Sequence, residues 1–142
     1  MKKVIWVNGC FDILHSGHIE LLEYAKSLGT HLIVGLDTDH RVRFYKGKHR
    51  PIVPLEERMK IISSLSCVDE VCSFNDDDEL EYEIYRRNID VMVVGEEYKS
   101  KGVIGFSFAK KIEYFKLKKG KSTSFIINKI LNEYCKEPFH NN

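Results

Sequence analysis

Three short runs of consecutive apolar residues constrain the fold more than any other feature of this 142-residue chain. They are Val4-Ile5-Trp6-Val7, Leu32-Ile33-Val34-Gly35-Leu36 and Val91-Met92-Val93-Val94. Because their apolar character is continuous rather than alternating, each run predicts a strand covered on both faces, as the strands of a parallel sheet are. Trp6 lies within the first run, so its side chain is expected in the core.

The segments between these runs carry helical patterns. An apolar stripe predicts a helix from about residue 17 that Gly29 stops; Pro54 opens a second helix, and acidic residues start a third at about 79–88. Ser122-Thr123 caps a last helix that runs to Tyr134. Further strands are expected at about 68–74 and 112–117, with a basic loop through residues 41–50 and a loop at 96–108. The order predicts an α/β fold, a single doubly wound parallel sheet of about five strands with helices on both faces.

The composition favours a single globular domain and argues against several classes of protein. The length and the 43% of hydrophobic residues fit one domain, expected over 1–136 with a frayed tail at 137–142. With 22 basic and 21 acidic residues, the chain lacks the basic excess of nucleic-acid binders. No apolar run approaches the roughly 18 residues of a membrane span, and no signal-peptide pattern opens the chain, so a cytoplasmic location is expected. The four cysteines form no C-x-x-C pair, so no metal site built from side chains is expected.

Glycine-containing loops follow the predicted strands. In a doubly wound sheet the ligand lies beyond the carboxyl ends of the strands, where glycine lets the backbone approach it and helix N-termini offer free N–H groups. This arrangement favours phosphate binding. The chain contains neither G-x-G-x-x-G nor G-x-x-x-x-G-K-[ST], so a dinucleotide fold for hydride transfer and a P-loop both lose support. The loops are 8–12, 15–18, 46–48, 95–99 and 120–124.

His15 and His18 open the first predicted helix. At a spacing of three residues their rings project from one face, where they can donate hydrogen bonds to phosphate oxygens. Two alternatives stand beside this interpretation. A purely structural histidine pair is the first, and a metal site is the second, which is less favoured because no thiol or further histidine lies nearby.

The run from Gly9 to His18, GCFDILHSGH, resembles the signature of the cytidylyltransferase-like nucleotidyltransferases. The resemblance extends through residues 37–39, 46–58, 68–69, 95–98 and 120–124, which is nearly the whole chain. Within the family, the spelling of 46–58 most resembles the bacterial heptose 1-phosphate adenylyltransferases. Glycerol-3-phosphate cytidylyltransferases come next, but Leu117 stands where their R-T-x-G-x-S-T-T ending has its arginine.

The resemblance implies a Rossmann-like fold and an enzyme that transfers a nucleotidyl group from ATP or CTP to a phosphorylated sugar or polyol, with release of pyrophosphate. Mg²⁺ would be bridged by the triphosphate, and the enzyme would be a homodimer. Three residues take catalytic roles: His15, His18 and Lys46. Nucleotide-binding roles fall to Gly9, Cys10, Phe11, Gly17, Gly95, Glu97, Lys121, Ser122 and Thr123, and acceptor-binding roles to Asp12, Asp37, Asp39 and Arg58.

Several of these residues have a second interpretation. Ser122 and Thr123 could serve only as a helix cap, Asp12 could orient the neighbouring backbone, and Arg58 could form a surface ion pair. Asp37 and Asp39 could simply end their strand. At the level of the whole chain, the alternative to an enzyme is an inactive nucleotide-binding module.

Overall fold

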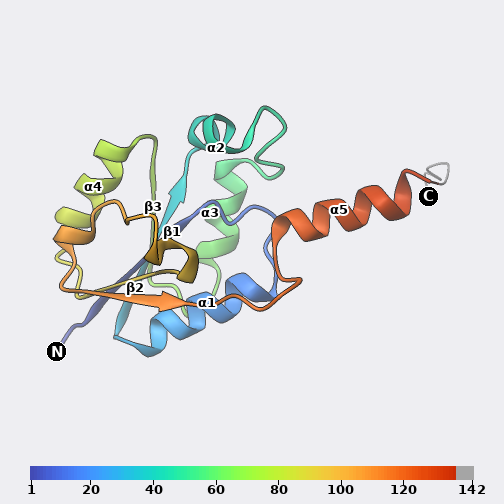
Figure 1. Ribbon diagram of the computed structural model, residues 1–142. Coiled ribbons are helices and arrows are strands. Elements are labelled where there is room, and N and C mark those ends of the chain that lie inside the picture. Colours follow the sequence, from blue (N-terminus) through green and yellow to red (C-terminus); the bar gives the residue numbers. More distant parts are fainter. Residues whose placement is uncertain (137–142) are drawn as a thin grey trace.

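Strands and helices alternate along residues 1–136, the part of the chain that the computed structural model describes (Figure 1). The expected tail at 137–142 lies outside these residues. In chain order the elements are β1 Val4–Gly9, α1 Ser16–Ser27, β2 His31–Asp37, α2 Asp39–Lys46, α3 Leu55–Ser63, β3 Glu70–Phe74, α4 Asp77–Tyr85, β4 Val91–Gly95, the short 3₁₀ helices η1 Glu96–Lys99 and η2 Phe106–Phe108, β5 Lys111–Phe115 and α5 Thr123–Tyr134.

The strands form one parallel sheet in the order β3-β2-β1-β4-β5. The chain winds outward from β1 in one direction and then returns to add β4 and β5 on the other side. This is the doubly wound α/β fold that the apolar runs predict. Its direction of winding reverses between β1 and β4, and the carboxyl ends of these two strands open a crevice at that point.

Both faces of the sheet are covered, which explains the continuous apolar runs. Alternate residues of β1 point to opposite sides: Ile5 and Val7 pack with Leu22 of α1 and Ile62 of α3, whereas Trp6 packs with α4. Trp6 is fully buried, as expected from its place in the first run. Two separate apolar clusters therefore hold the sheet in place, one on each face.

Residues 39–46 differ from the prediction, because the expected basic loop is largely the helix α2. Thr38 caps this helix by accepting a hydrogen bond from the Arg41 backbone N–H. Only Val42 supplies a buried apolar side chain, so the sequence shows no apolar stripe there. The expected loop at 96–108 contains η1 and η2, and the last strand ends at Phe115 rather than at Leu117.

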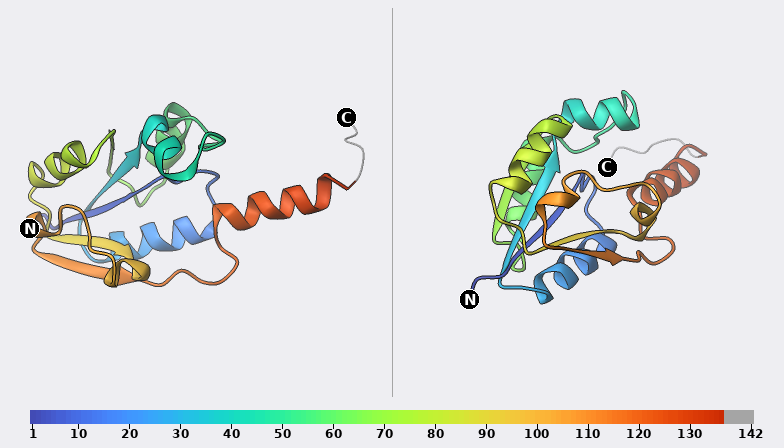
Figure 2. Two further views of the ribbon diagram at one scale, coloured as in Figure 1. Left: turned by 45° about the horizontal axis from the view of Figure 1, so that its top comes forward. Right: turned by 60° about the vertical axis from the view of Figure 1, so that its left-hand side comes forward.

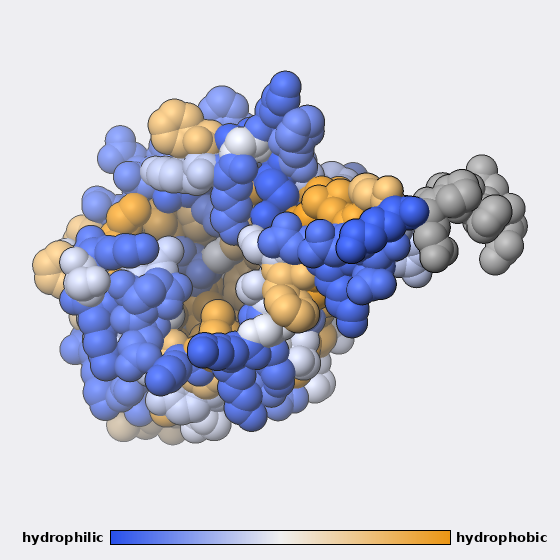
Figure 3. All heavy atoms as spheres, turned by 45° about the vertical axis from the view of Figure 1, so that its right-hand side comes forward, coloured by the Kyte–Doolittle hydropathy of each residue, from blue (hydrophilic) through white to orange (hydrophobic). Residues whose placement is uncertain are grey.

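The helix α5 projects from the rest of the molecule in every view (Figures 1 and 2). None of its residues is buried, and large apolar side chains such as Phe125, Ile130 and Leu131 are about half exposed. Figure 3 shows orange apolar side chains gathered along this helix. Within residues 1–136, neither α5 nor any other helix is long and apolar enough to cross a membrane.

Candidate functional site

A cavity of about 440 Å³ lies beyond the carboxyl ends of β1, β2 and β4. It occupies the crevice expected where the winding of the sheet reverses, and the space-filling view shows this side of the molecule hollowed between hydrophilic rims (Figure 3). The structure brings five of the predicted residues together around it. They are Gly9, Cys10, Asp37, Lys46 and Gly95.

The two histidines form a stacked pair at the start of α1. Their ring centroids are 3.7 Å apart. His15 Nδ1 accepts a hydrogen bond from the Gly17 backbone N–H at 3.1 Å, and His18 Nδ1 accepts one from the His15 backbone N–H at 3.3 Å. A neutral imidazole whose Nδ1 accepts must carry its proton on Nε2. Both rings can therefore present an Nε2–H donor to an anion at the helix N-terminus.

The environment keeps both histidines neutral near pH 7. Burial, and after it the positive charge of Lys121, lowers the pKa of His15. For His18, burial together with the charges of His15 and Lys46 lowers the pKa to about 4, although Asp12 opposes the shift. A positively charged imidazole is disfavoured in this environment. A polyanion would relieve this penalty, so the pair is suited to binding phosphate groups.

The segment before α5 closes over the histidine pair. A Cβ on Gly17 would lie 3.0 Å from the His15 ring and 3.0 Å from Lys121 Cβ, so glycine is what lets this segment approach α1. Lys121 Nζ pairs with Glu20 of α1 at 2.5 Å. Ser122 accepts from the Phe125 N–H as a helix cap, and Thr123 Oγ1 donates to the Asp12 carbonyl. These groups border the same anion-binding corner as the histidines.

Three of the four predicted acceptor-binding residues do not line the cavity but form hydrogen bonds within the protein. Asp12 and Arg58 are buried, whereas a third of the Asp39 side chain is exposed. The carboxylate of Asp12 accepts from the backbone N–H groups of Ile52 and Val53 and from Arg50, all at 2.8–2.9 Å. Burial alone would raise the pKa of Asp12, but these hydrogen bonds lower it. Asp12 thus orients the neighbouring backbone, as its second interpretation held.

Arg58 corrects one expectation. Its guanidinium is buried rather than part of a surface ion pair, with only 1% of the residue exposed. It donates to the carbonyl oxygens of Cys10, Asp37 and Val53 at 2.8–2.9 Å and to Asp39 Oδ1 at 2.7 Å. The same Asp39 oxygen accepts from the backbone N–H at the start of α3. Through these partners, Arg58 and Asp39 link the ends of β1 and β2 to the start of α3, and neither residue lines the cavity.

The other predicted nucleotide-binding residues differ in backbone geometry and burial. Phe11 has φ 51° and its ring is buried against His18, with the ring centroids 5.1 Å apart. Burial raises the pKa of the Cys10 thiol, which is therefore protonated at neutral pH. The exposed Glu97 carboxylate folds over Gly95, where a Cβ would lie 2.5 Å from it.

Other cavity residues were not predicted from the sequence. Arg41 and Tyr45 come from α2, which was expected to be a loop, and Tyr98 comes from η1. The spacing of Asp37 and Arg41 is four residues, an ion-pair spacing that would have drawn attention to Arg41 had the helix been recognised. The remaining lining residues are Asn8, Leu80, Val94, Gly102, Val103 and Ile104.

Comparison with known proteins identifies the family that this arrangement belongs to. The model of the cytidylyltransferase-like family matches residues 6–132. The chain belongs to this family. The resemblance of residues 9–18 to the family signature is thereby confirmed.

Individual relatives agree with the family assignment. The bifunctional protein HldE of Helicobacter pylori (strain ATCC 700392 / 26695) is 45% identical over 129 residues, 91% of this chain and 28% of the relative. HldE of Citrifermentans bemidjiense is 42% identical over 137 residues, with 94% and 28% covered. This chain thus spans little more than a quarter of these relatives. Among solved structures, a lipopolysaccharide core biosynthesis protein from Thermoplasma volcanium GSS1 has a TM-score of 0.66 at 26% identity, over 83% of this chain and 98% of that one.

The donor set of the site suits phosphate oxygens rather than a directly bound cation. In residues 1–136 no group of three or more His, Cys, Asp or Glu side chains is arranged to hold a metal ion. Hard cations such as Mg²⁺ prefer several oxygen ligands, whereas the groups at the anion corner are imidazole N–H, ammonium and backbone N–H donors.

Proposed function

We propose that this member of the family is a nucleotidyltransferase that moves the adenylyl group of ATP onto a heptose 1-phosphate, with release of pyrophosphate. The observation that carries the proposal is the stacked pair of His15 and His18. Both rings present Nε2–H donors at a helix N-terminus, next to a cavity that Lys46 lines. The identity to HldE proteins supports the choice of acceptor.

The reaction needs no general base. A phosphate monoester has a second pKa of about 6, so the attacking oxygen is already largely ionised at neutral pH. Catalysis then depends on in-line positioning and on neutralising charge at the α-phosphoryl group and the leaving pyrophosphate. Neutral His18 and the ammonium of Lys46 would stabilise the transferred group, and Lys121, Ser122 and Thr123 would hold the outer phosphates. Mg²⁺ would enter with the triphosphate as part of the substrate.

Pyrophosphate release tests the proposal. The protein is incubated with Mg²⁺ and either ATP or CTP, each with D-glycero-β-D-manno-heptose 1-phosphate or glycerol 3-phosphate. We expect turnover with ATP and the heptose phosphate. Turnover with CTP and glycerol 3-phosphate alone would contradict the assignment in favour of a cytidylyltransferase, and no turnover in any arm would favour an inactive binding module.

We also propose that the protein is a cytoplasmic homodimer in which α5 packs against a second copy. The apolar side chains of Phe125, Ile130 and Leu131 stand about half exposed on a helix that contributes no buried residue to its own domain. Light scattering after size-exclusion chromatography tests the association. The double variant Ile130→Glu/Leu131→Glu should be monomeric, whereas Tyr82→Glu, at an exposed apolar position of α4, should not change the mass.

A further inference from the structure

Arg41 forms a wall between two hollows at the carboxyl end of the sheet. One is the cavity of about 440 Å³ already described, and the other is an open depression of about 520 Å³ bordered by α2 and the start of α4. Arg41 and Tyr45 line both. Neither His15 nor His18 lines either hollow.

The guanidinium of Arg41 is held by two carboxylates and lies against two aromatic rings. Its Nε donates to Asp37 Oδ1 at 2.8 Å, and its terminal nitrogen pairs with Asp77 Oδ1 of α4 at 2.9 Å. Its central carbon lies 5.0 Å from the Tyr45 ring centroid and 5.2 Å from that of Phe74, within the range of cation–π contacts. Only 9% of the Arg41 side chain is exposed. The arginine therefore holds Asp37 in one orientation.

Asp37 keeps one carboxylate oxygen available. Within residues 1–136 its Oδ1 accepts from Arg41, and no hydrogen bond is made to its Oδ2. No buried side-chain oxygen or nitrogen of these residues lacks a partner, so Oδ2 is open to solvent, and Asp37 lines the cavity. A carboxylate oxygen that is oriented by a neighbour and left open to a cavity is an acceptor for a ligand hydroxyl.

The surroundings of this oxygen match a polyhydroxylated ligand with a phosphate. The phenols of Tyr45 and Tyr98 line the same cavity and can donate or accept hydrogen bonds. Val94, Val103 and Ile104 offer an apolar surface to the C–H groups of a ring, and Lys46 supplies a positive charge for the phosphate. Few placed polar groups in a mostly preformed cavity are what fixes a ligand's orientation.

We infer that Asp37, held by Arg41 and flanked by Tyr98, reads a hydroxyl of the acceptor sugar and so selects a sugar phosphate over a smaller polyol phosphate. This inference rests on the proposed function, because it assigns the cavity to the acceptor of that reaction. In it Asp37 is the specificity-determining residue. Arg41 is a positioning residue that acts through Asp37 and need not touch the acceptor.

Binding and kinetics of Asp37 variants test the inference. Calorimetry on the full chain measures the Kd of D-glycero-β-D-manno-heptose 1-phosphate, glycerol 3-phosphate and inorganic phosphate, and pyrophosphate release measures KM for acceptor and ATP. Asp37→Leu should weaken heptose phosphate binding roughly 10- to 100-fold, the range for a hydrogen bond to a charged group, and leave inorganic phosphate binding within about twofold. The KM for ATP should stay unchanged, and the preference for the heptose phosphate over glycerol 3-phosphate should fall.

Two further variants separate a loss of acceptor recognition from a loss of folding. Asp37→Asn keeps the shape and one oxygen, so it should fold like the wild type and lose part of the selectivity. Arg41→Met should raise the KM for the acceptor without changing the KM for ATP. The matched control is Arg87→Met, which removes a similarly buried, doubly paired arginine at the other end of the sheet and should leave both KM values unchanged.

The outcomes for the inference and for the proposed function can be told apart. If the wild type turns over the heptose phosphate and the Asp37 and Arg41 variants keep its KM within twofold, the inference is wrong while the function stands. If the wild type releases no pyrophosphate, the proposed function is wrong. The Kd values for the phosphate ligands then test the role of Asp37 separately. Selective loss of heptose phosphate binding in Asp37→Leu then supports it. Equal binding in both proteins, or none in the wild type, overturns it.

Discussion

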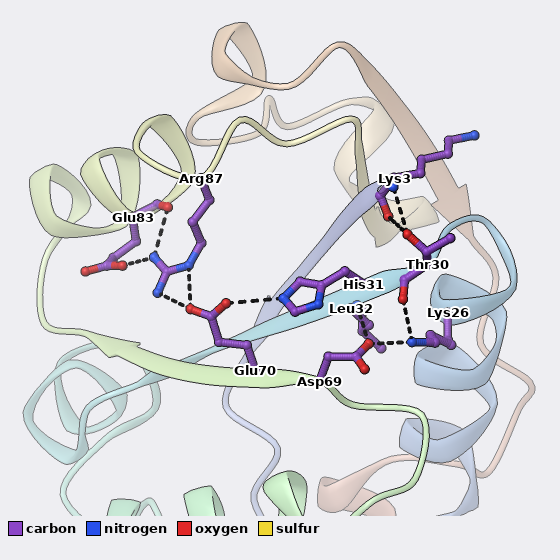
Figure 4. A network of polar contacts seen from close by, with 9 residues as sticks. All are labelled: Lys3, Lys26, Thr30, His31, Leu32, Asp69, Glu70, Glu83 and Arg87. Carbon is purple, nitrogen blue, oxygen red and sulfur yellow. Dashed lines mark hydrogen bonds and ion pairs between the residues drawn. The ribbon is translucent and has the colours of Figure 1, made fainter. Parts of the chain in front are cut away.

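Arg41 and Arg87 form similar ion-pair arrangements at opposite ends of the sheet. Each pairs with a carboxylate four residues earlier in the chain and with a second one on another element, and each guanidinium faces an aromatic ring. Arg87 joins Glu83 of α4 to Glu70 of β3 (Figure 4). Their side chains are 9% and 7% exposed. Local chemistry alone would not tell the two arginines apart.

Their carboxylate partners differ in whether they border a cavity. At the amino end, Glu70 Oε1 accepts from Arg87 and its Oε2 faces His31 at 3.4 Å, while Asp69 Oδ2 binds both Lys26 and the Leu32 N–H (Figure 4). At the carboxyl end, Asp37 leaves an oxygen open to a cavity. Glu83 Oε1 and Asp69 Oδ1 likewise accept no hydrogen bond among the described residues, but neither residue lines the two cavities described above. A spare acceptor beside a cavity indicates ligand binding, whereas ion pairs that border neither cavity indicate stabilisation.

The largest expected effect comes from the buried network under the cavity. Arg58→Met should lower the free energy of unfolding by about 3–5 kcal/mol, because it leaves three carbonyl oxygens without their buried donor and removes one of the two donors to Asp39 Oδ1. Urea denaturation followed by circular dichroism measures the change. A loss below about 1 kcal/mol would mean that water replaces the guanidinium without cost. The networks at the carboxyl and amino ends of the sheet would then not differ in their contribution to stability.

Substitutions of a histidine at each end of the sheet should differ strongly in their effect on activity. His18→Ala should reduce kcat/KM about 10²–10³-fold, as expected when one donor to a transition-state charge is lost. His31→Ala, at the amino end, should leave kcat/KM within about twofold. Pyrophosphate release under the conditions of the functional test measures both. Equal losses in the two variants would show that the histidines act only through stability.

Low pH should destabilise the protein through groups at the carboxyl ends of the strands. The pKa of His18 is about 4 in the folded protein, below the ordinary value of 6.5 that the unfolded chain has. Between these values the unfolded chain binds more protons, so stability falls as the pH decreases from 6.5 to 4, by up to about 3 kcal/mol and less where solvent reaches the ring. Asp12, whose pKa is also lowered, adds a further loss below its ordinary range.

Comparison of His18→Gln with the wild type isolates the histidine contribution. Chemical denaturation at pH 4, 5, 6 and 7 should give a flatter dependence for the variant. Lys26→Met serves as the control for a substitution at the other end of the sheet, and its curve should parallel that of the wild type over this range. Parallel curves for His18→Gln and the wild type would contradict the proposed cause.

The smallest effect is expected at the amino end. Lys26 and Asp69 form an ion pair at 2.5 Å, but both side chains are about 30% exposed. Such pairs contribute about 0–1 kcal/mol, so Lys26→Met should change the free energy of unfolding within that range. Urea denaturation in low and high salt measures it. A loss comparable to that of Arg58→Met would break the distinction between the two networks.

The sequence predicts the sheet well because its strands are buried on both faces and thus apolar without interruption. It predicts α2 poorly, because that helix lies at the end of the sheet and buries little besides Val42 and Arg41. The same failure conceals the wall between the two hollows, because its residues, Arg41 and Tyr45, come from α2. Arg58 shows a further limit: the adjacent Glu56 and Glu57 suggest a surface position, yet its hydrogen-bond partners lie far from it in the sequence.

The single guanidinium of Arg58 makes one side of the cleft rigid. It links the ends of β1 and β2 and the segment before α3, so these three cannot shift independently. The opposite side, formed by η1 and residues 102–104, has no such tie among the hydrogen bonds of the described residues. Any adjustment of the cleft to ligands of different size is therefore expected on that side, while the side tied by Arg58 keeps its shape.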